Sequence, residues 1–138
     1  MEIYDGNKQD SCNRSSDRYL QINSCGVQNI ENVTYLVRRE QGRLDYHILL
    51  IAKGKCDADY RDGTYTLQEG DFILYYPHER QQYLFYSEYK TRSYWVHFAG
   101  TAVPEMLEQA GLADGGVYRT NRCQDITAVF QKLVLLFN

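Results

Sequence analysis

Residues 46–77, YHILLIAKGKCDADYRDGTYTLQEGDFILYYP, contain the pattern that decides the predicted fold. Runs of strand-forming residues alternate there with turn residues, and the predicted strands are 46–53, 56–61, 64–68 and 72–76. The turns between them are Gly54-Lys55, Asp62-Gly63 and Glu69-Gly70-Asp71. Asp-Gly between two such runs is the strongest signal for a two-residue hairpin, and Pro77 ends the last strand because it cannot donate to a sheet ladder. The stretch therefore predicts consecutive antiparallel strands.

The same pattern extends on both sides of this stretch. Further β-favouring runs cover residues 19–23, 33–37, 83–86 and 92–99. A strand thus recurs about every ten residues, which is typical of an antiparallel sandwich or barrel. We predict a mainly β domain, an antiparallel sandwich or barrel, over residues 18–100. Residues 1–17 are polar and lack apolar periodicity, so they predict a flexible N-terminal arm.

The periodicity changes after Gly100, and two C-terminal helices are predicted within residues 101–138. Thr101 can cap the first helix and Gly111 can end it. Asp125 can cap the second helix, whose apolar stripe consists of Ile126, Val129, Phe130, Leu133, Leu136 and Phe137. A stripe of this width predicts pairing with a second copy of the chain, and packing on the chain's own barrel is the alternative. Because the stripe reaches the last residues, we expect the natural chain to continue beyond Asn138.

Composition and charge indicate a single globular domain, since 43% of the 138 residues are apolar and 24% are charged. The sequence has neither the ~18 consecutive apolar residues of a membrane span nor a hydrophobic signal core, so a cytoplasmic location is expected. The net charge is −3, and the densest basic cluster, Arg38, Arg39 and Arg43, is flanked by Glu40 and Asp45. Nucleic-acid binding requires a basic surface, so the chain is not expected to bind DNA by itself.

Motifs for catalysis or metal binding are missing from the sequence. The four cysteines form no CxxC pair, which predicts reduced thiols and neither zinc ligands nor disulfides. The histidines, His47, His78 and His97, lie far apart in the sequence and form no HxH pair. The sequence also has no Gly-x-Ser-x-Gly elbow and no phosphate-binding loop. We therefore predict a protein that is not an enzyme and has no metal or cofactor.

The predicted strand at 92–99 has two different faces. One face carries Ser93, Trp95 and His97, and the other carries aromatic and aliphatic residues. The single tryptophan therefore has polar neighbours. A flat aromatic ring beside hydrogen-bonding groups suits a sugar, because the ring covers a C–H face while the polar groups bind hydroxyls. The alternative is a tryptophan at the rim of the barrel, since the opposite face is the more apolar one.

Four ordered segments carry a family resemblance: REQGRLDYHILLIAKG at 39–54, LQEGDFILYYP at 67–77, QY at 82–83 and YWVHFAG at 94–100. In this order and spacing they resemble the N-terminal cupin domain of AraC-family transcription regulators over about residues 18 to 108. The resemblance implies a cupin-like antiparallel barrel (double-stranded β-helix or jelly roll) that binds a small effector, often a sugar, followed by helices that form a homodimer. Full-length members carry two helix-turn-helix motifs after this domain, and no such region is present here.

The resemblance also implies roles for individual residues. Arg39 is similar to the family's sugar-contacting arginine, Tyr83 to a tyrosine after the loop, and Trp95 to the stacking tryptophan. Gln28 is similar to a further polar contact. Ser93 stands where the arabinose-binding member has a histidine, so that member's ligand contacts do not transfer as a set. The predicted ligand-binding residues are Arg39, Tyr83, Trp95, Gln28, Ser93 and His97.

Three hypotheses about function remain open from the sequence. The first is the effector-sensing and dimerisation domain of an AraC-type regulator, in which a small molecule, a sugar by preference, controls DNA binding by a further C-terminal domain. The second is a small cupin metalloenzyme, an isomerase or a dioxygenase. Gln81 and Gln82 stand where many relatives carry histidine, which speaks against a metal. The third is a purely structural dimerisation domain without a ligand.

Overall fold

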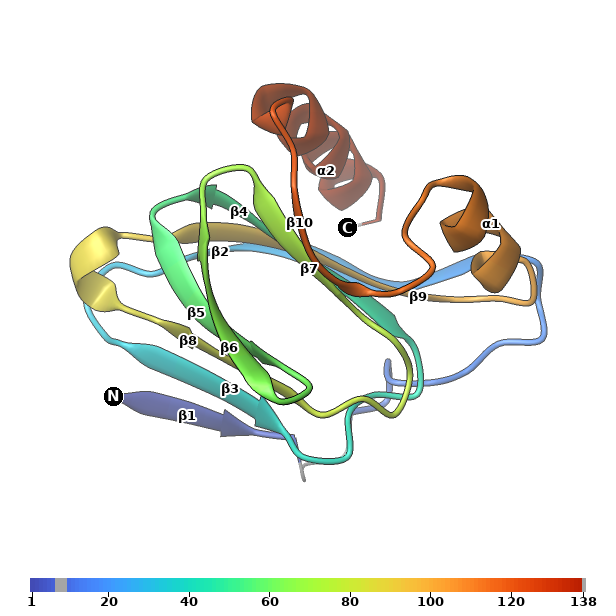
Figure 1. Ribbon diagram of the computed structural model, residues 1–138, viewed down its shortest axis with the longest axis horizontal. Helices are drawn as coiled ribbons and strands as arrows, with labels where there is room; N and C mark the ends of the chain where they lie inside the picture. The colour runs from blue at the N-terminus through green and yellow to red at the C-terminus, as the bar shows by residue number, and fades with distance from the viewer. Residues whose placement is uncertain (7–9, 138) are drawn as a thin grey trace.

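Two five-stranded sheets packed face to face form the body of the computed structural model, which describes residues 1–6 and 10–137 (Figure 1). The first sheet has the order β1 (Glu2–Asp5), β3 (Tyr35–Arg39), β8 (Gln81–Phe85), β5 (Lys55–Tyr60), β6 (Gly63–Gln68). The second has the order β10 (Gly116–Arg119), β7 (Asp71–Tyr75), β4 (Tyr46–Lys53), β9 (Arg92–Ala99), β2 (Gln21–Asn29). A short 3-10 helix, η1 (Ser87–Tyr89), precedes β9.

Two helices, α1 (Val103–Gln109) and α2 (Cys123–Phe137), lie outside the second sheet (Figure 1). The prediction of a mainly β, cupin-like fold followed by two helices is confirmed. No helix within the described ranges is long and apolar enough to cross a membrane. Residues 7–9 of the predicted arm and Asn138 of the predicted helical segment lie outside the described residues.

Two strands were not predicted. β1 lies in the segment predicted to be an irregular arm, where it pairs in parallel with β3. β10 lies between the two helices and pairs with β7. Both strands have four residues and stand at sheet edges, so their sequences carry too few alternating positions to show a period of two. The prediction of an irregular segment is therefore wrong for residues 2–5, and the prediction of two helices alone after Gly100 is incomplete.

Local signals misplaced one turn and two helix caps. Tyr60 pairs with Gly63, so the hairpin turn is Arg61-Asp62 and not Asp62-Gly63, with Arg61 taking the positive φ of 53°. The N-cap of α1 is Ala102, which makes no side-chain capping bond, and Thr101 is not the cap. α2 begins at Cys123, so Asp125 lies within its first turn, where a negative charge favours the helix dipole.

Successive residues of a strand face opposite sides of its sheet, so the strands contribute to two cores. One core lies between the two sheets, and the other lies between the second sheet and the helices. Along β4, Leu49 and Ile51 point between the sheets, whereas Leu50 points to the helices. Only part of the apolar stripe of α2 packs into the core between the second sheet and the helices. Phe130 is buried and Ile126 and Leu133 pack beside it, but Val129 and Leu136 are exposed. The prediction of one continuous pairing stripe is therefore wrong, because half of it covers the chain's own sheet.

Candidate functional site

A cavity of about 440 Å³ lies between the two sheets. It is lined by residues of β1, β2, β3, β4, β8 and β9 and by the segment that precedes β2. The structure brings all six predicted residues to this cavity: Gln28, Arg39, Tyr83, Ser93, Trp95 and His97. The other lining residues are Tyr4, Asp10, Cys12, Ser24, Val27, Tyr35, Val37, Leu49 and Phe85.

Trp95 lies against the backbone of β2. Gly26 is its cross-strand partner, and a Cβ atom added there would lie 2.4 Å from Cη2 of the indole. Only glycine leaves room for the ring at this point, so Gly26 fixes where the indole lies. Trp95 also packs against the apolar core between the sheets and is half-buried, so it lies within the barrel and not only at its rim. Gly26 lies outside the predicted strand 19–23, so its close contact with Trp95 was not predicted.

Arg39 is held by side chains of its own sheet, from β8 and β1. Its Nη1 donates to Oε1 of Gln81 at 3.0 Å and to the hydroxyl of Tyr83 at 3.1 Å. The ring of Tyr4, on β1, lies 5.2 Å from the guanidinium carbon, a cation–π contact. Oε1 of Gln81 also lies 2.9 Å from Nδ1 of His47. One amide oxygen of the first sheet thus orients an arginine and a histidine of opposite sheets at the cavity.

Two histidines that lie 50 positions apart in the sequence meet inside the barrel. His47 and His97 are cross-strand partners, and their ring centroids are 4.4 Å apart. Burial is the main cause that lowers the pKa of His47 well below its usual value, and the positive charge of Arg39 adds to this effect. Burial also lowers the pKa of His97, and the neighbouring His47 adds to this effect. Both rings are therefore neutral. His78 is exposed in the turn after β7.

Several polar atoms in this region have no hydrogen-bond partner among the described residues. They are Nε2 of His47, Nε2 of Gln81, Oγ of Ser93 and both ring nitrogens of His97. Each lies in a buried residue, and a buried polar group without a partner costs about 1–3 kcal/mol. Ser93 and His97 line the cavity itself. These atoms are buried, so they gain a partner only from a group that packs directly against them. No group of three or more metal-ligating side chains occurs in the described part of the chain.

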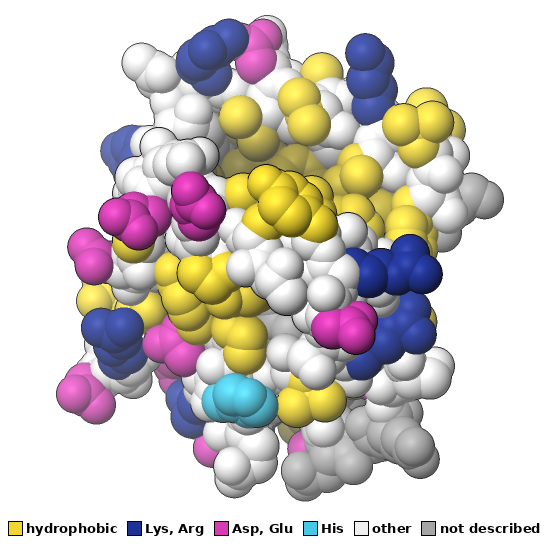
Figure 2. Space-filling model, turned by 90° about the vertical axis from the view of Figure 1, so that its right-hand side faces the viewer, with side chains coloured by type: hydrophobic (Ala, Val, Ile, Leu, Met, Phe, Trp, Pro, Cys, Tyr) yellow, Lys and Arg dark blue, Asp and Glu magenta, His cyan; other side chains and the backbone are white. Residues whose placement is uncertain are grey.

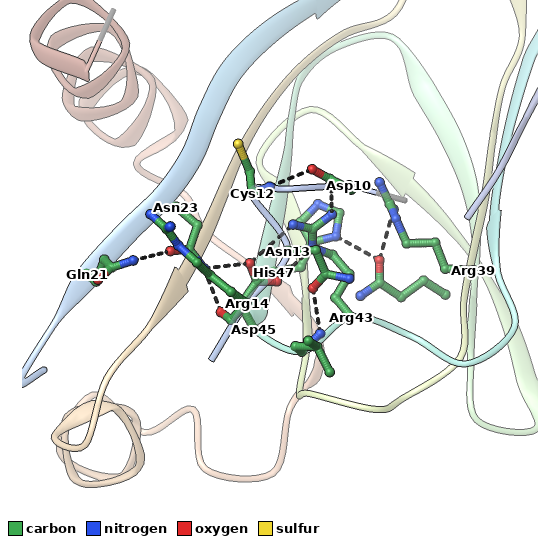
Figure 3. A network of polar contacts seen from close by, with 12 residues as sticks. Asp10, Cys12, Asn13, Arg14, Gln21, Asn23, Arg39, Arg43, Asp45 and His47 are labelled. Carbon is green, nitrogen blue, oxygen red and sulfur yellow. Dashed lines mark hydrogen bonds and ion pairs between the residues drawn. The ribbon is translucent and has the colours of Figure 1, made fainter. Parts of the chain in front are cut away.

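A buried ion pair fastens the segment before β2 to the barrel (Figure 3). Arg43 is 1% exposed and donates from Nε and Nη2 to the two carboxylate oxygens of Asp45, at 2.7 and 3.2 Å. Its Nη1 donates to Asp10 at 3.0 Å. Oδ1 of Asn13 accepts from the backbone N–H of Leu44. Asp10 is thereby placed at the cavity, which the sequence did not predict.

The charge of Asp10 is stabilised in this position. Burial alone would raise the pKa of its carboxyl group, but the backbone N–H of Cys12 and the guanidinium of Arg43 hold the pKa below its usual value. Asp10 and Arg39 therefore face the cavity with opposite charges. The cavity combines this balanced pair with neutral polar groups and the indole of Trp95.

A β sandwich with an internal polar and aromatic cavity defines a domain that binds small molecules. A sequence model described as "AraC-like ligand binding domain" matches residues 31–137. The chain belongs to this family, which confirms the resemblance found in the sequence. Because this is a family of ligand-binding domains, the metalloenzyme hypothesis is dropped. No curated protein sequence matches the chain.

Solved structures support the same fold. ToxT from Vibrio cholerae, bound to (E)-4-(8-methylnaphthalen-1-yl)but-3-enoic acid, is similar with a TM-score of 0.59 and 16% identity, over 88% of this chain and 49% of ToxT. A ToxT structure at 1.65 Å resolution has a TM-score of 0.56 and 16% identity, over 85% of this chain and 48% of ToxT. At this identity the likeness concerns the fold alone. The chain spans about half the length of these structures.

The buried histidines predict a pH-dependent stability. Below about pH 6.5 the unfolded chain protonates both histidines whereas the folded chain does not, so the free energy of unfolding falls as the pH falls. The expected slope is about 1.4 kcal/mol per pH unit for each histidine. Urea unfolding between pH 7.5 and 5 measures it. His97→Gln should reduce the slope, and His78→Gln, at an exposed position, should not. A stability independent of pH in this range would contradict the neutral, buried pair.

Proposed function

We propose that this chain is the effector-sensing and dimerisation domain of an AraC-type transcription regulator, and that its effector is a sugar. The observation that carries the proposal is the cavity, whose lining combines the indole of Trp95 with Ser93 and His97, residues that have buried polar atoms without a partner in the described part of the chain. A sugar has both a C–H face for the ring and hydroxyl groups that donate and accept hydrogen bonds.

The charges around the cavity favour a neutral, polar ligand. Asp10 and Arg39 carry opposite charges, and His97 is neutral. Ser24, Gln28 and Ser93 add uncharged donors and acceptors. A ligand with a large apolar body would leave these groups unpaired, and that loss is what makes a polar site reject apolar analogues.

Regulation in this proposal acts through a further domain. The chain's net charge is −3, so DNA is bound by a C-terminal domain of the complete protein, in the cytoplasm. The effector shifts the equilibrium between two conformations of the protein, and the size of the shift is limited by the difference between its affinities for them. The segment held by Arg43 and Asp45 connects the cavity to the surface of the barrel.

Thermal unfolding with a panel of monosaccharides and disaccharides tests the proposal. A sugar at about 100 times its dissociation constant should raise the stability by about 2.7 kcal/mol. Trp95→Leu should abolish the increase, whereas Tyr65→Leu, at an exposed aromatic residue of β6, should preserve it. Stabilisation by the naphthalenyl butenoic acid found on ToxT, with none by any sugar, would overturn the assignment of a sugar.

The exposed part of α2 supports the proposed homodimer. Val129 is 63% exposed and Leu136 is 86% exposed. They are seven residues apart and so share one face of the helix. Leu135 is 80% exposed beside them, and hydrophobic side chains also reach the surface on the side of the molecule in Figure 2. Exposed apolar surface of this kind is typical of an interface, and a twofold pair is the commonest closed assembly.

Substitution on α2 tests the dimer. Leu136→Asp should convert the dimer to a monomer in analytical ultracentrifugation, because it places a charge in the paired apolar surface. Val33→Asp, at an exposed apolar residue outside α2, should leave the dimer intact. Leu133 is unsuitable for this test because it packs on the chain's own sheet. A monomeric unmodified protein at high concentration, or a dimeric Leu136→Asp variant, would contradict this assembly.

A further inference from the structure

The cavity has a polar end, an apolar middle and a second polar end. On β9 the lining residues are His97, Trp95 and Ser93, and on β3 they are Arg39, Val37 and Tyr35. Both strands thus place polar groups two residues on either side of an apolar or aromatic one. Because alternate residues of a strand face the same side, these positions follow one another along the cavity.

The strand register aligns these positions across the barrel. Trp95 pairs with Gly26 of β2 and with Leu49 of β4, which forms the middle layer. His97 pairs with Ser24 at the end near Asp10, which we call the arm end. Ser93 pairs with Gln28 at the opposite end, which we call the far end. In the first sheet, Val37 pairs with Tyr83, Arg39 with Gln81 and Tyr35 with Phe85.

The two polar ends are too far apart for one sugar ring to reach both. Ser93 and His97 are four residues apart on an extended strand, which separates them by roughly 13 Å. Arg39 and Tyr35 are separated in the same way on β3. A ring stacked on Trp95 can bind the groups of one end, and a second ring is needed to fill the other.

The far end has the chemistry of a binding subsite. Ser93 is one of the residues that line the cavity. It is 1% exposed, and its buried Oγ has no partner among the described residues. The half-buried side chains of Gln28 and Tyr35 line the same end. A single sugar held by Arg39 and His97 would leave the Ser93 hydroxyl buried and unpaired, which is costly.

We propose that the effector is a sugar of disaccharide length, with one ring at the arm end and the second at the far end. This inference rests on the proposed function, since it assumes that the cavity binds sugars. Arg39, His97 and Ser24 bind the first ring. Ser93, Gln28 and Tyr35 bind the second, and Trp95 stacks at the middle of the cavity.

Isothermal titration calorimetry with lactose, maltose, cellobiose and melibiose, against glucose and galactose, tests the length. We expect a disaccharide to bind at least about tenfold more tightly than either of its component sugars. Ser93→Ala should weaken the disaccharide by about tenfold and leave the monosaccharide unchanged, whereas Ser24→Ala, at the arm end, should weaken both. Cooperative thermal unfolding of each variant shows that it is folded.

The possible failures can be told apart. A monosaccharide that binds as tightly as any disaccharide overturns the inference and leaves the proposed function standing. Equal weakening of both classes by Ser93→Ala, or of neither, also overturns the inference, because the far end then holds no second ring. Binding of no sugar in either class overturns the proposed function and the inference with it.

Discussion

The interior of the barrel contains buried polar side chains whose hydrogen bonds are not completed within residues 1–6 and 10–137. The strands around them contribute closely packed apolar residues such as Leu49, Ile51 and Phe85. The polar groups therefore lie in a mostly apolar wall. His97 and Ser93 stand in that wall with unpartnered atoms. A fold selected only for stability would replace such groups by apolar ones of similar shape. The polar ligand proposed for the cavity would complete these hydrogen bonds and so account for the polar groups.

Two sets of polar contacts hold the side chains at the arm end of the cavity in place. Gln81 accepts from Arg39 and bonds to His47, so the two sheets hold one another's polar groups at the arm end. The buried guanidinium of Arg43 forms ion pairs with both Asp45 and Asp10. Loss of Arg43 would leave the buried carboxylate of Asp45 without an ionic partner, which is far more costly than loss of a surface pair. The cavity, the segment before β2 and the sheet are therefore one connected polar assembly.

Most of the fold could be predicted from the sequence because period-two alternation is local. The two faces of β9 were predicted correctly for the same reason, and Ser93, Trp95 and His97, predicted to share one face, all line the cavity. The contact of His47 with His97 could not be predicted, since it depends on the register between strands that are distant in sequence. The same holds for Gly26 beneath Trp95. The division of the α2 stripe was also hidden, because helical periodicity shows which residues share a face but not how much of it the sheet covers.

If the barrel keeps buried polar groups for a ligand, these groups lower its stability when no ligand is bound. The test is the free energy of unfolding of Ser93→Ala in ligand-free buffer, with Thr91→Val as the comparison. The Thr91 hydroxyl is buried and satisfied, since it donates to the carbonyl of Lys55 at 2.6 Å, so its removal should cost about 1–3 kcal/mol. Ser93→Ala should instead leave the stability unchanged or raise it by up to about 1 kcal/mol. A loss as large as that of Thr91→Val would show that the Ser93 hydroxyl is already satisfied without ligand, and would contradict the account.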